Sequence, residues 1–375
     1  MFNKVLVLTV SVGAGHNRAA QALEKALREG EAAREVAVVD ALDYMSKAFW
    51  TLYQKTYFTV IRKLPDLHRY FFDQLDKPWQ KERRRLQFDK VNARAFIKLL
   101  ENEPPDLIIC THFLPAEIVS WLKAKERLRC PQAIIVTDFD VHAMWLCHHY
   151  EHYFVTIEEA KVHLEQLGIP AEKITVSGIP IDSVFSQEKD KRQMRLTHGL
   201  DPEKPTILLS AGGWGHGPLE AMLANLTKLR HPAQVVAICG RNEELKQRLD
   251  QIAAAVPAES PVVLQPIGFT TEMDEYMSAA DILLGATGGL TVSEALAKGL
   301  AFVVMNPLRG QEERNSDHLL EQGAAIRCNN LPTLAYKIDT LLDDPARLAA
   351  MQAHARRISH PQAARTIVET VQAWQ

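Results

Sequence analysis

Three stretches of this chain share one pattern, in which a short apolar run leads into a glycine-rich loop and then into a helical pattern. The runs are residues 4–10, 206–210 and 281–284, and their loops are SVGAGH, AGGWGHG and GATGGLT. A buried strand that enters a glycine turn and a helix is the βα unit of a doubly wound parallel sheet. Because one such unit opens each half of the chain, the sequence predicts two α/β domains.

The rest of the chain fits this division. At 375 residues it is long enough for two domains of ordinary size. Residues 183–204 are polar, charged and flanked by proline, which predicts a linker. We therefore expect domains at 1–182 and 205–358. A final helix at 359–375 carries an apolar stripe that could cross back to cover the first domain.

Charge, hydropathy and cysteine content narrow the class of protein. The net charge of −3 gives no electrostatic footprint for nucleic acid, so no such partner is expected. The apolar runs have the length of strands, which predicts no transmembrane helix, and the N-terminus lacks a signal-peptide pattern. Five scattered cysteines without a CxxC pair are typical of a reducing cytoplasm.

His16 is the first candidate catalytic residue. It lies at the start of a predicted helix, where the partial positive charge of the helix disfavours imidazolium. A neutral histidine at the carboxyl end of a strand suits a general base at pH 7. A hydrogen-bonded histidine in a tight turn is the alternative. His112 and Asp138 also follow predicted strands, so we expect them at the same sheet edge.

Residues 138–152 contain groups that could suggest a metal. Asp138 and Asp140 could hold Mg²⁺ or Mn²⁺ against a diphosphate, but no other carboxylate cluster supports such a site. The nearby histidines and Cys147 match no zinc spacing. No metal site and no cofactor are predicted.

Residues 44–95 are aromatic and basic. Ten of the 27 aromatic residues lie in 44–79, and twelve Lys and Arg face six Asp and Glu between 43 and 95. A basic, aromatic, amphipathic segment suits an anionic membrane surface. A core stripe with a solvated charged face is the alternative, and a nucleic-acid site is a weaker third. The candidate membrane residues are Phe49, Trp50, Tyr53, Tyr57, Arg83, Arg84 and Arg85.

The second half carries a candidate nucleotide site. The glycine-rich helix start at 285–291 could bind a diphosphate through exposed backbone N–H groups. Glu294 could accept hydrogen bonds from a ribose diol, although a carboxylate there also simply complements the helix dipole. Residues 309–315 are a row of polar side chains that suits the hydroxyls of a sugar, or caps the next helix.

These motifs, taken together, resemble a known family. They are SVGAGH (11–16), THFLP (111–115), VTDFDVHAMW (136–145), SGIPI (177–181), SAGGWGHG (210–217), GATGGLTVSEALAKGLAFVV (285–304) and GQEERN (310–315). The chain resembles the GT-B glycosyltransferases of the lipid-sugar branch, the monogalactosyldiacylglycerol synthases and processive diacylglycerol glucosyltransferases. The transferase that adds GlcNAc in forming peptidoglycan lipid II is a more distant relative.

The resemblance implies a fold, a reaction and a set of site residues. The fold would be GT-B, with two Rossmann-like domains facing across a cleft, and the reaction would be inverting and metal-free. His16 would deprotonate the acceptor hydroxyl, with Asp138 as its support. Acceptor-side residues would be Gly15, His112, His142 and Trp145. Donor-side residues would be Gly212, Gly213, Gly268, Phe269, Thr287, Gly288, Gly289, Leu290, Thr291, Glu294, Gln311, Glu312 and Asn315.

The implied function is transfer of a hexose from a UDP-sugar to diacylglycerol or a glycosyl-diacylglycerol, on the inner face of the cell membrane. Trp214 stands where small or polar residues are common in the phosphate loop, and SVGAGH has one glycine fewer than many members. Two alternatives keep the same fold: transfer to a soluble acceptor, and a sugar-nucleotide epimerase. A third is a non-catalytic sensor of a UDP-sugar and a membrane.

Overall fold

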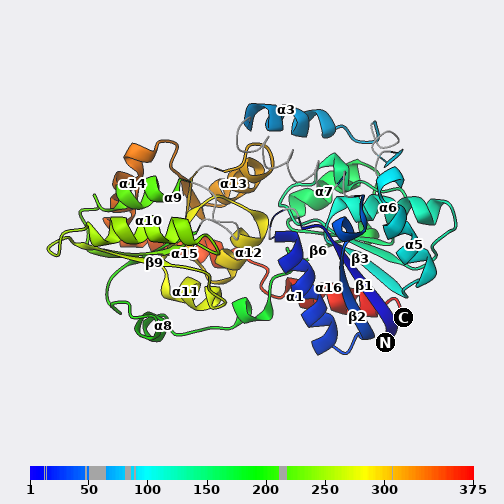
Figure 1. Cartoon of the computed structure of the whole chain (residues 1–375), viewed down its shortest axis with the longest axis horizontal. Coiled ribbons are helices and arrows are strands. Elements are labelled where there is room, and N and C mark those ends of the chain that lie inside the picture. The colour runs from blue at the N-terminus through cyan, green and yellow to red at the C-terminus, as the bar shows by residue number, and fades with distance from the viewer. Residues whose placement is uncertain are drawn as a thin grey trace. The chain divides into compact units, whose positions relative to one another are not determined.

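The chain forms two α/β units, each built on a six-stranded parallel sheet (Figure 1). The computed structural model describes all residues except 12, 14, 47–48, 50–64, 81–85, 88–89, 211–217 and 306, and the side chains of 65 and 68. By their contacts, the first unit comprises Met1–Ser183, Leu308–Arg314 and His360–Gln375. The second comprises Val184–Pro307 and Asn315–Ser359. The predicted pair of Rossmann-like folds is confirmed.

The sheet of the first unit has the strand order β2-β1-β3-β4-β5-β6. Its strands are β1 (Phe2–Thr9), β2 (Ala33–Asp40), β3 (Leu107–Cys110), β4 (Gln132–Ile135), β5 (His152–Val155) and β6 (Ile174–Val176). Its helices are α1 (Gly15–Glu29), α3 (Pro65–Leu75), α5 (Arg94–Asn102), α6 (Phe113–Ala124), α7 (Glu158–Gln166) and α16 (Ala363–Gln372).

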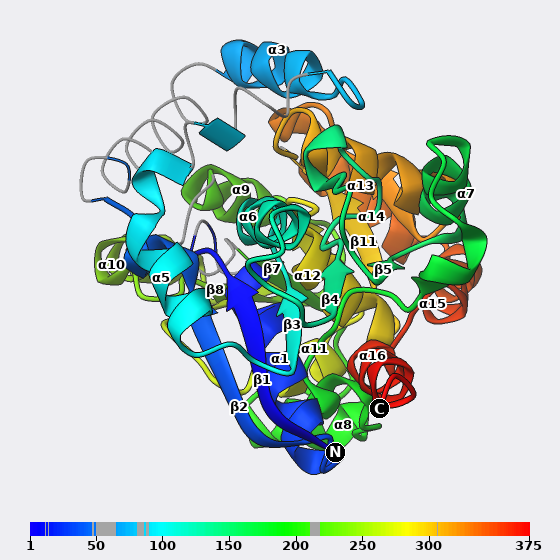
Figure 2. The ribbon, with the colours of Figure 1, turned by 90° about the vertical axis from the view of Figure 1, so that its right-hand side faces the viewer.

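Alternation along the strands places one core on each face of this sheet. Leu6, Leu8 and Ile108 pack on the face covered by α5, α6 and α7. Val5, Val7 and Ile109 point to the opposite face, where α1 and α16 close the core. The C-terminal helix α16 therefore covers one face of the sheet that contains the N-terminal strand β1. Both chain ends lie close together in this unit (Figure 2).

The sheet of the second unit has the order β12-β11-β10-β7-β8-β9. Its strands are β7 (Thr206–Ser210), β8 (Ala233–Ile238), β9 (Val262–Ile267), β10 (Ile282–Gly285), β11 (Ala301–Val304) and β12 (Ala325–Arg327). Its helices are α8 (Lys191–Thr197), α9 (Leu219–Leu226), α10 (Glu243–Ala254), α11 (Met273–Ala279), α12 (Gly289–Ala297), α14 (Leu334–Leu342) and α15 (Pro345–Arg357). Helix α13 (Gln311–Glu321) starts in the segment assigned to the first unit and continues into the second.

Most of the segment expected as a linker, 183–204, is an ordered part of the second unit. It contains the short 3₁₀ helix Ser183–Ser186 and α8, which packs on α11. The Arg195 guanidinium is buried and ion-paired with Asp281 at 2.6 Å. A buried arginine with paired donors holds this segment on the sheet, which polarity in the sequence does not reveal.

Candidate active site

His16 lies at the point in the first sheet where the strand order reverses. Strand β1 has β2 on one side and β3 on the other, so the loops after β1 and β3 diverge there. In open α/β sheets the ligand crevice forms outside the carboxyl ends of the strands at this reversal. Helix α1 begins at Gly15, which places His16 in its first turn and at this edge.

Hydrogen bonds determine which nitrogen of His16 carries the proton. Nδ1 lies 3.0 Å from the carbonyl oxygen of Thr111 and 2.9 Å from Oγ1 of Thr137. Because a carbonyl only accepts, Nδ1 must donate, and Nε2 of the neutral ring then keeps its lone pair. Among the described residues, none hydrogen-bonds to Nε2. Burial lowers the pKa of His16 to about 4, despite the opposing hydrogen bond to Thr111.

His112 supports this ring. Its Nδ1 caps α6 by accepting from the amide of Leu114 at 3.1 Å. Its ring lies edge-on to that of His16, with centroids 4.7 Å apart. Burial, and then the neighbouring His16, lower the pKa of His112 well below its ordinary value. Both rings are therefore neutral at pH 7, and for His16 the cause is burial, whereas the sequence argument relied on the partial charge of the helix.

Asp138 follows β4 at the same edge. Its Oδ1 accepts from Nε2 of Gln311 at 2.6 Å, and its carbonyl accepts from Thr156 Oγ1 at 2.7 Å. The groups that orient Nδ1 of His16 are instead Thr111 and Thr137, which the sequence interpretation did not single out. Each directly precedes a residue that it did single out, His112 or Asp138.

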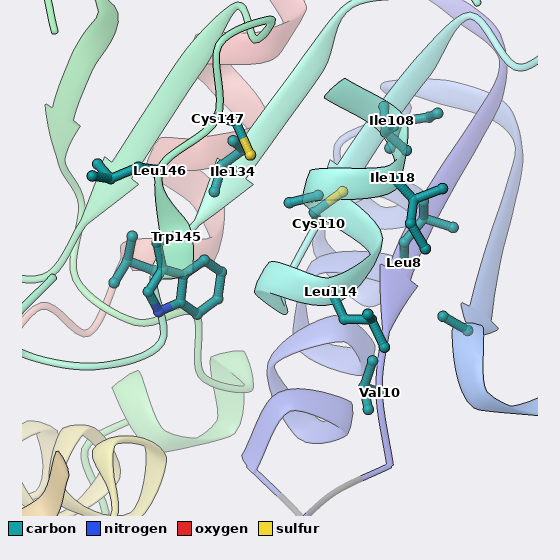
Figure 3. Close-up of a cluster of buried hydrophobic side chains, with 14 of the residues drawn as sticks. Leu8, Val10, Ile108, Cys110, Leu114, Ile118, Ile134, Trp145, Leu146 and Cys147 are labelled. Carbon is teal, nitrogen blue, oxygen red and sulfur yellow. The ribbon is translucent and has the colours of Figure 1, made fainter. Parts of the chain in front are cut away.

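Two predicted acceptor contacts are corrected. Both ring nitrogens of His142 are used within the protein, because Nδ1 accepts from Met144 and Nε2 donates to the carbonyl of Phe72 at 3.0 Å. Trp145 is only 2% exposed and packs in the core on the α6 side of the sheet (Figure 3). Both side chains therefore support the sheet edge from inside.

Gln311 and Glu312, expected to contact the donor sugar, lie at the start of α13 within the first unit. Oε2 of Glu312 accepts from the amide of Leu308 at 2.6 Å. Burial raises the pKa of Glu312 to about 7; the Leu308 amide opposes this, and the charge of Asp138 adds to it. A carboxyl that titrates near neutrality thus lies beside Asp138.

In the second unit, the predicted diphosphate loop also occupies a reversal of strand order. Strand β7 pairs with both β8 and β10, and the loop after β10 leads through Thr287 and Gly288 into α12. The first-turn residues Gly289, Leu290 and Thr291 lie where helix N–H groups have no intrahelical partner. Asn315 fixes the loop, since its Nδ2 donates to the carbonyl of Thr287 at 2.9 Å.

Two further donor-side residues differ in exposure. Glu294, in α12, is only 2% exposed. Phe269, just after Gly268 and β9, is 57% exposed, and the Arg241 guanidinium lies 4.7 Å from its ring centroid. In the described part of the chain, no atom lies within 4 Å of a Cβ built on Gly268, so there is open space beside this glycine. Arg241 was missed because a single arginine after a strand carries no sequence signal.

Several predicted residues lie outside the described residues: Gly212, Gly213, Trp50, Tyr53, Tyr57, Arg83, Arg84 and Arg85. Phe49 is described and is 4% exposed within the core of the first unit. The prediction that Phe49 faces a membrane is wrong, because its side chain is buried in the hydrophobic core of the first unit.

One group in the described part of the second unit has the donor set of a metal site. His198, Glu272 and Glu275 each offer a ligand atom within 4.8 Å of the others. However, Glu275 accepts from His198 at 2.9 Å and from Lys189 at 3.0 Å. An ammonium group already neutralises this carboxylate, so the arrangement is that of an ion-pair network.

Comparison with known families agrees with this architecture. Residues 16–181 match the monogalactosyldiacylglycerol (MGDG) synthase family, and residues 194–358 match the glycosyl transferases group 1 family. A processive diacylglycerol beta-glucosyltransferase of Staphylococcus epidermidis is 30% identical over 326 residues, covering 85% of this chain and 80% of that protein. The enzyme of the same name from Staphylococcus saprophyticus is 29% identical over 354 residues, covering 93% and 87%.

Solved structures establish the fold. Acinetobacter baumannii MurG superimposes with a TM-score of 0.66 at 16% identity and 99% coverage of both chains. UDP-GlcNAc 2-epimerase from Neisseria meningitidis gives 0.61 at 17% identity, covering 98% of this chain and 99% of that one. With this GT-B fold and the sequence matches along both units, the chain belongs to the MGDG synthase and processive diacylglycerol glucosyltransferase family of glycosyltransferases.

Proposed function

We propose that this glycosyltransferase moves a hexose from a UDP-sugar to the hydroxyl of diacylglycerol or a glycosyl-diacylglycerol. The observation that carries the proposal is the state of His16: Nδ1 donates to Thr111, so Nε2 is the proton acceptor at the sheet edge. The relatives named above are diacylglycerol glucosyltransferases, which supports a lipid hydroxyl as acceptor.

The reaction would be a single displacement. Nε2 of His16 takes the proton of the acceptor hydroxyl as its oxygen attacks C1 of the sugar, and the bond from C1 to the UDP oxygen breaks. The α-linked donor gives a β-linked product, as the relatives' names indicate for theirs. The resulting imidazolium shares its Nδ1 proton with Thr111 and Thr137. Gly15 and His112 are proposed to line the acceptor side. Because Thr111 and Thr137 already hold Nδ1 of His16, the proposed support from Asp138 would be electrostatic, through its charge at the same sheet edge.

The second unit would hold the donor. The N–H groups of Gly289, Leu290 and Thr291 suit the two phosphates, whose charge rises as the bond breaks. Phe269, exposed beside Gly268, suits the face of uracil, and Glu294 suits the paired hydroxyls of ribose. This chemistry needs no metal, because backbone donors stabilise the leaving group. Gly212 and Gly213 are proposed to add to the same cradle.

We further propose that the protein is cytoplasmic and acts at the anionic inner face of the cell membrane. None of the described helices has the length and apolar character needed to cross a membrane. Helix α3 exposes Leu67, Tyr70 and Phe71, the last two at 58% and 52%, next to exposed Arg69. Exposed aromatics beside a cation suit the headgroup region of a bilayer. The predicted membrane residues Trp50, Tyr53, Tyr57, Arg83, Arg84 and Arg85 lie in the same stretch of chain.

A product assay tests the proposal. Purified protein is incubated with radiolabelled UDP-glucose, UDP-galactose or UDP-GlcNAc and with vesicles that contain diacylglycerol and phosphatidylglycerol. We expect a labelled glycolipid from one hexose donor, and further sugars on it if the enzyme is processive. Transfer only to water-soluble acceptors, C2 epimerisation of the donor, or donor binding without any turnover would each contradict the proposal.

A further inference from the structure

Arg314 makes an unusual set of contacts for a surface arginine. Its Nη1 donates to Oδ2 of Asp140 at 2.8 Å, and its Nη2 donates to Oδ2 of Asp76 at 2.7 Å. The same guanidinium lies over the ring of Phe72, 5.2 Å from the centroid. One planar cation therefore joins two carboxylates, one after α3 and one after β4, and stacks on an aromatic ring.

The partners of Arg314 are themselves held in place. Oδ1 of Asp76 accepts from the amide of Ala143 at 2.8 Å, and Nε2 of His142 donates to the carbonyl of Phe72. The rings of Phe72 and His142 lie 4.2 Å apart. The end of α3 is thereby tied to the loop after β4, so Arg314 binds a preformed pair of carboxylates.

Phe72 also contacts the turn before Arg314. Gly310 has φ +93°, and a Cβ placed there would lie 2.9 Å from the Phe72 ring. The turn therefore needs glycine for its conformation and for the close approach of the ring. A second ion pair, between Arg309 and Asp66, ties the same turn to the start of α3.

The turn held in this way carries the two predicted donor-sugar residues. Gln311 donates to Asp138, which follows β4, and Glu312 accepts from Leu308 within the same turn, so both side chains have fixed partners in the first unit. Arg314 is three residues beyond Gln311 and secures the first turn of α13. Moving Arg314 from its carboxylates would release the segment at its C-terminal side.

We propose that Arg314 is a positioning residue for the donor sugar, with Phe72 and Asp76 completing its clamp. The inference rests on the proposed transfer from a UDP-sugar and on the expectation, given by the family resemblance, that Gln311 and Glu312 contact the donor sugar. The clamp keeps these side chains at fixed positions, so the sugar meets a preorganised set of hydrogen-bond partners. Lysine is a poor replacement for Arg314, because an ammonium group lacks the planar fork whose two Nη atoms donate to Asp140 and Asp76 while its face lies over Phe72.

Steady-state kinetics of the full-length protein test the inference through a split of parameters. We expect Arg314→Gln to raise the KM for the UDP-sugar about tenfold, and Arg314→Lys and Asp76→Asn to raise it severalfold. The Kd for UDP alone should change less than about twofold, because UDP is assigned to the second unit. A merely structural role would lower the melting temperature of the variants without changing the KM for the donor.

Arg127 offers a matched control in the same unit. It pairs with Glu101 at 2.6 Å and lies 5.1 Å from the Trp121 ring centroid, so it is also an ion-paired, stacked arginine. Arg127→Gln should leave the KM for the donor unchanged. An unchanged KM in Arg314→Gln, together with a raised KM in Gln311→Ala, would overturn the positioning role.

Hydrogen–deuterium exchange separates this inference from the proposed function. In Arg314→Gln, the amides of residues 308–313 should exchange at least about tenfold faster, while Arg127→Gln leaves them unchanged. Unchanged exchange in Arg314→Gln overturns the clamp, whatever the kinetics. If Gln311→Ala leaves the KM for the donor unchanged, the expected sugar contact of Gln311 fails, and the positioning role fails with it even where exchange is faster.

Discussion

The two points at which strand order reverses, one in each sheet, present different chemical groups at the carboxyl ends of the strands. In the first unit, side chains occupy the reversal between β1 and β3: His16 and His112, with Thr111 and Thr137 orienting Nδ1. In the second, the reversal between β7 and β10 presents a backbone turn and a helix start, with Glu294 buried behind it. In the proposed function, the same topology would provide a proton acceptor in one unit and an anion-binding site in the other.

The difference follows from what each edge must do. A base needs a lone pair in a defined direction, which a side chain held by two hydrogen bonds provides. A diphosphate needs several donors on one surface, which a helix N-terminus provides without added charge. The two edges should therefore fail in different ways when they are altered.

The largest effect is expected at His16. His16→Ala should reduce kcat roughly 10²- to 10⁴-fold, the usual contribution of a general base, with the Kd for UDP nearly unchanged. Rates are measured with diacylglycerol vesicles, and UDP binding by calorimetry. His152→Gln is the control, because His152 also has a pKa lowered to about 4 but hydrogen-bonds to Thr175 on β6. Wild-type turnover in His16→Ala would show that His16 is not the general base.

Glu312 makes the first edge sensitive to pH. Its pKa is about 7 in the folded chain against an ordinary value of 4.5, so the folded state binds the proton more tightly. Its contribution to the free energy of unfolding is complete below pH 4.5 and is lost as the pH rises through 7, by roughly 3 kcal/mol.

Urea denaturation at pH 5 and pH 8 measures this contribution. Glu312→Gln should remove most of the fall in stability between the two pH values. Glu321→Gln, at an exposed position of the same helix, should not. If the free energy of unfolding still falls as much between pH 5 and pH 8 in Glu312→Gln, groups other than Glu312 cause the fall.

Glu294 tests the second edge. Glu294→Gln should weaken UDP binding roughly 10- to 100-fold, since hydrogen bonds to a charged group are worth about 1.5–3 kcal/mol. The fall in stability with pH that Glu312 causes in the first unit should be unchanged in this variant. Calorimetry with UDP gives the Kd, and Glu259→Gln, an exposed carboxylate of the same unit, is the control. An unchanged Kd would leave Glu294 with the role of complementing the helix dipole.

Phe269 is expected to give the smallest effect. Phe269→Ala should weaken UDP binding about fivefold through lost stacking, with little change in stability because the ring is largely exposed. Val263→Ala, which also truncates an exposed apolar side chain, here within β9 itself, should not change the Kd. If Phe269→Ala binds UDP with the wild-type Kd, uracil does not stack on Phe269.

Local patterns in the sequence were sufficient to predict the βα units. Apolar runs, glycine turns and helix starts act over a few residues, so His16 at the start of α1 and Gly288 at the cap of α12 could be placed from the sequence alone. The membrane prediction for Phe49 was wrong because it also relied on a local pattern. Aromatic residues at helical spacing can face either a core or a membrane, and the spacing does not distinguish the two.

Only the tertiary structure decided which groups meet. Thr111, which accepts from Nδ1 of His16, lies 95 residues from it in the sequence, and Thr137 lies 121 residues from it. Gln311 and Asp138, which are hydrogen-bonded, are separated by 173 residues. These pairs depend on strand order and on chain segments returning to a distant sheet, which no local pattern encodes. The sequence alone therefore determined that a histidine stands at a helix start, and the packing of three strand ends determined which of its nitrogens can take a proton.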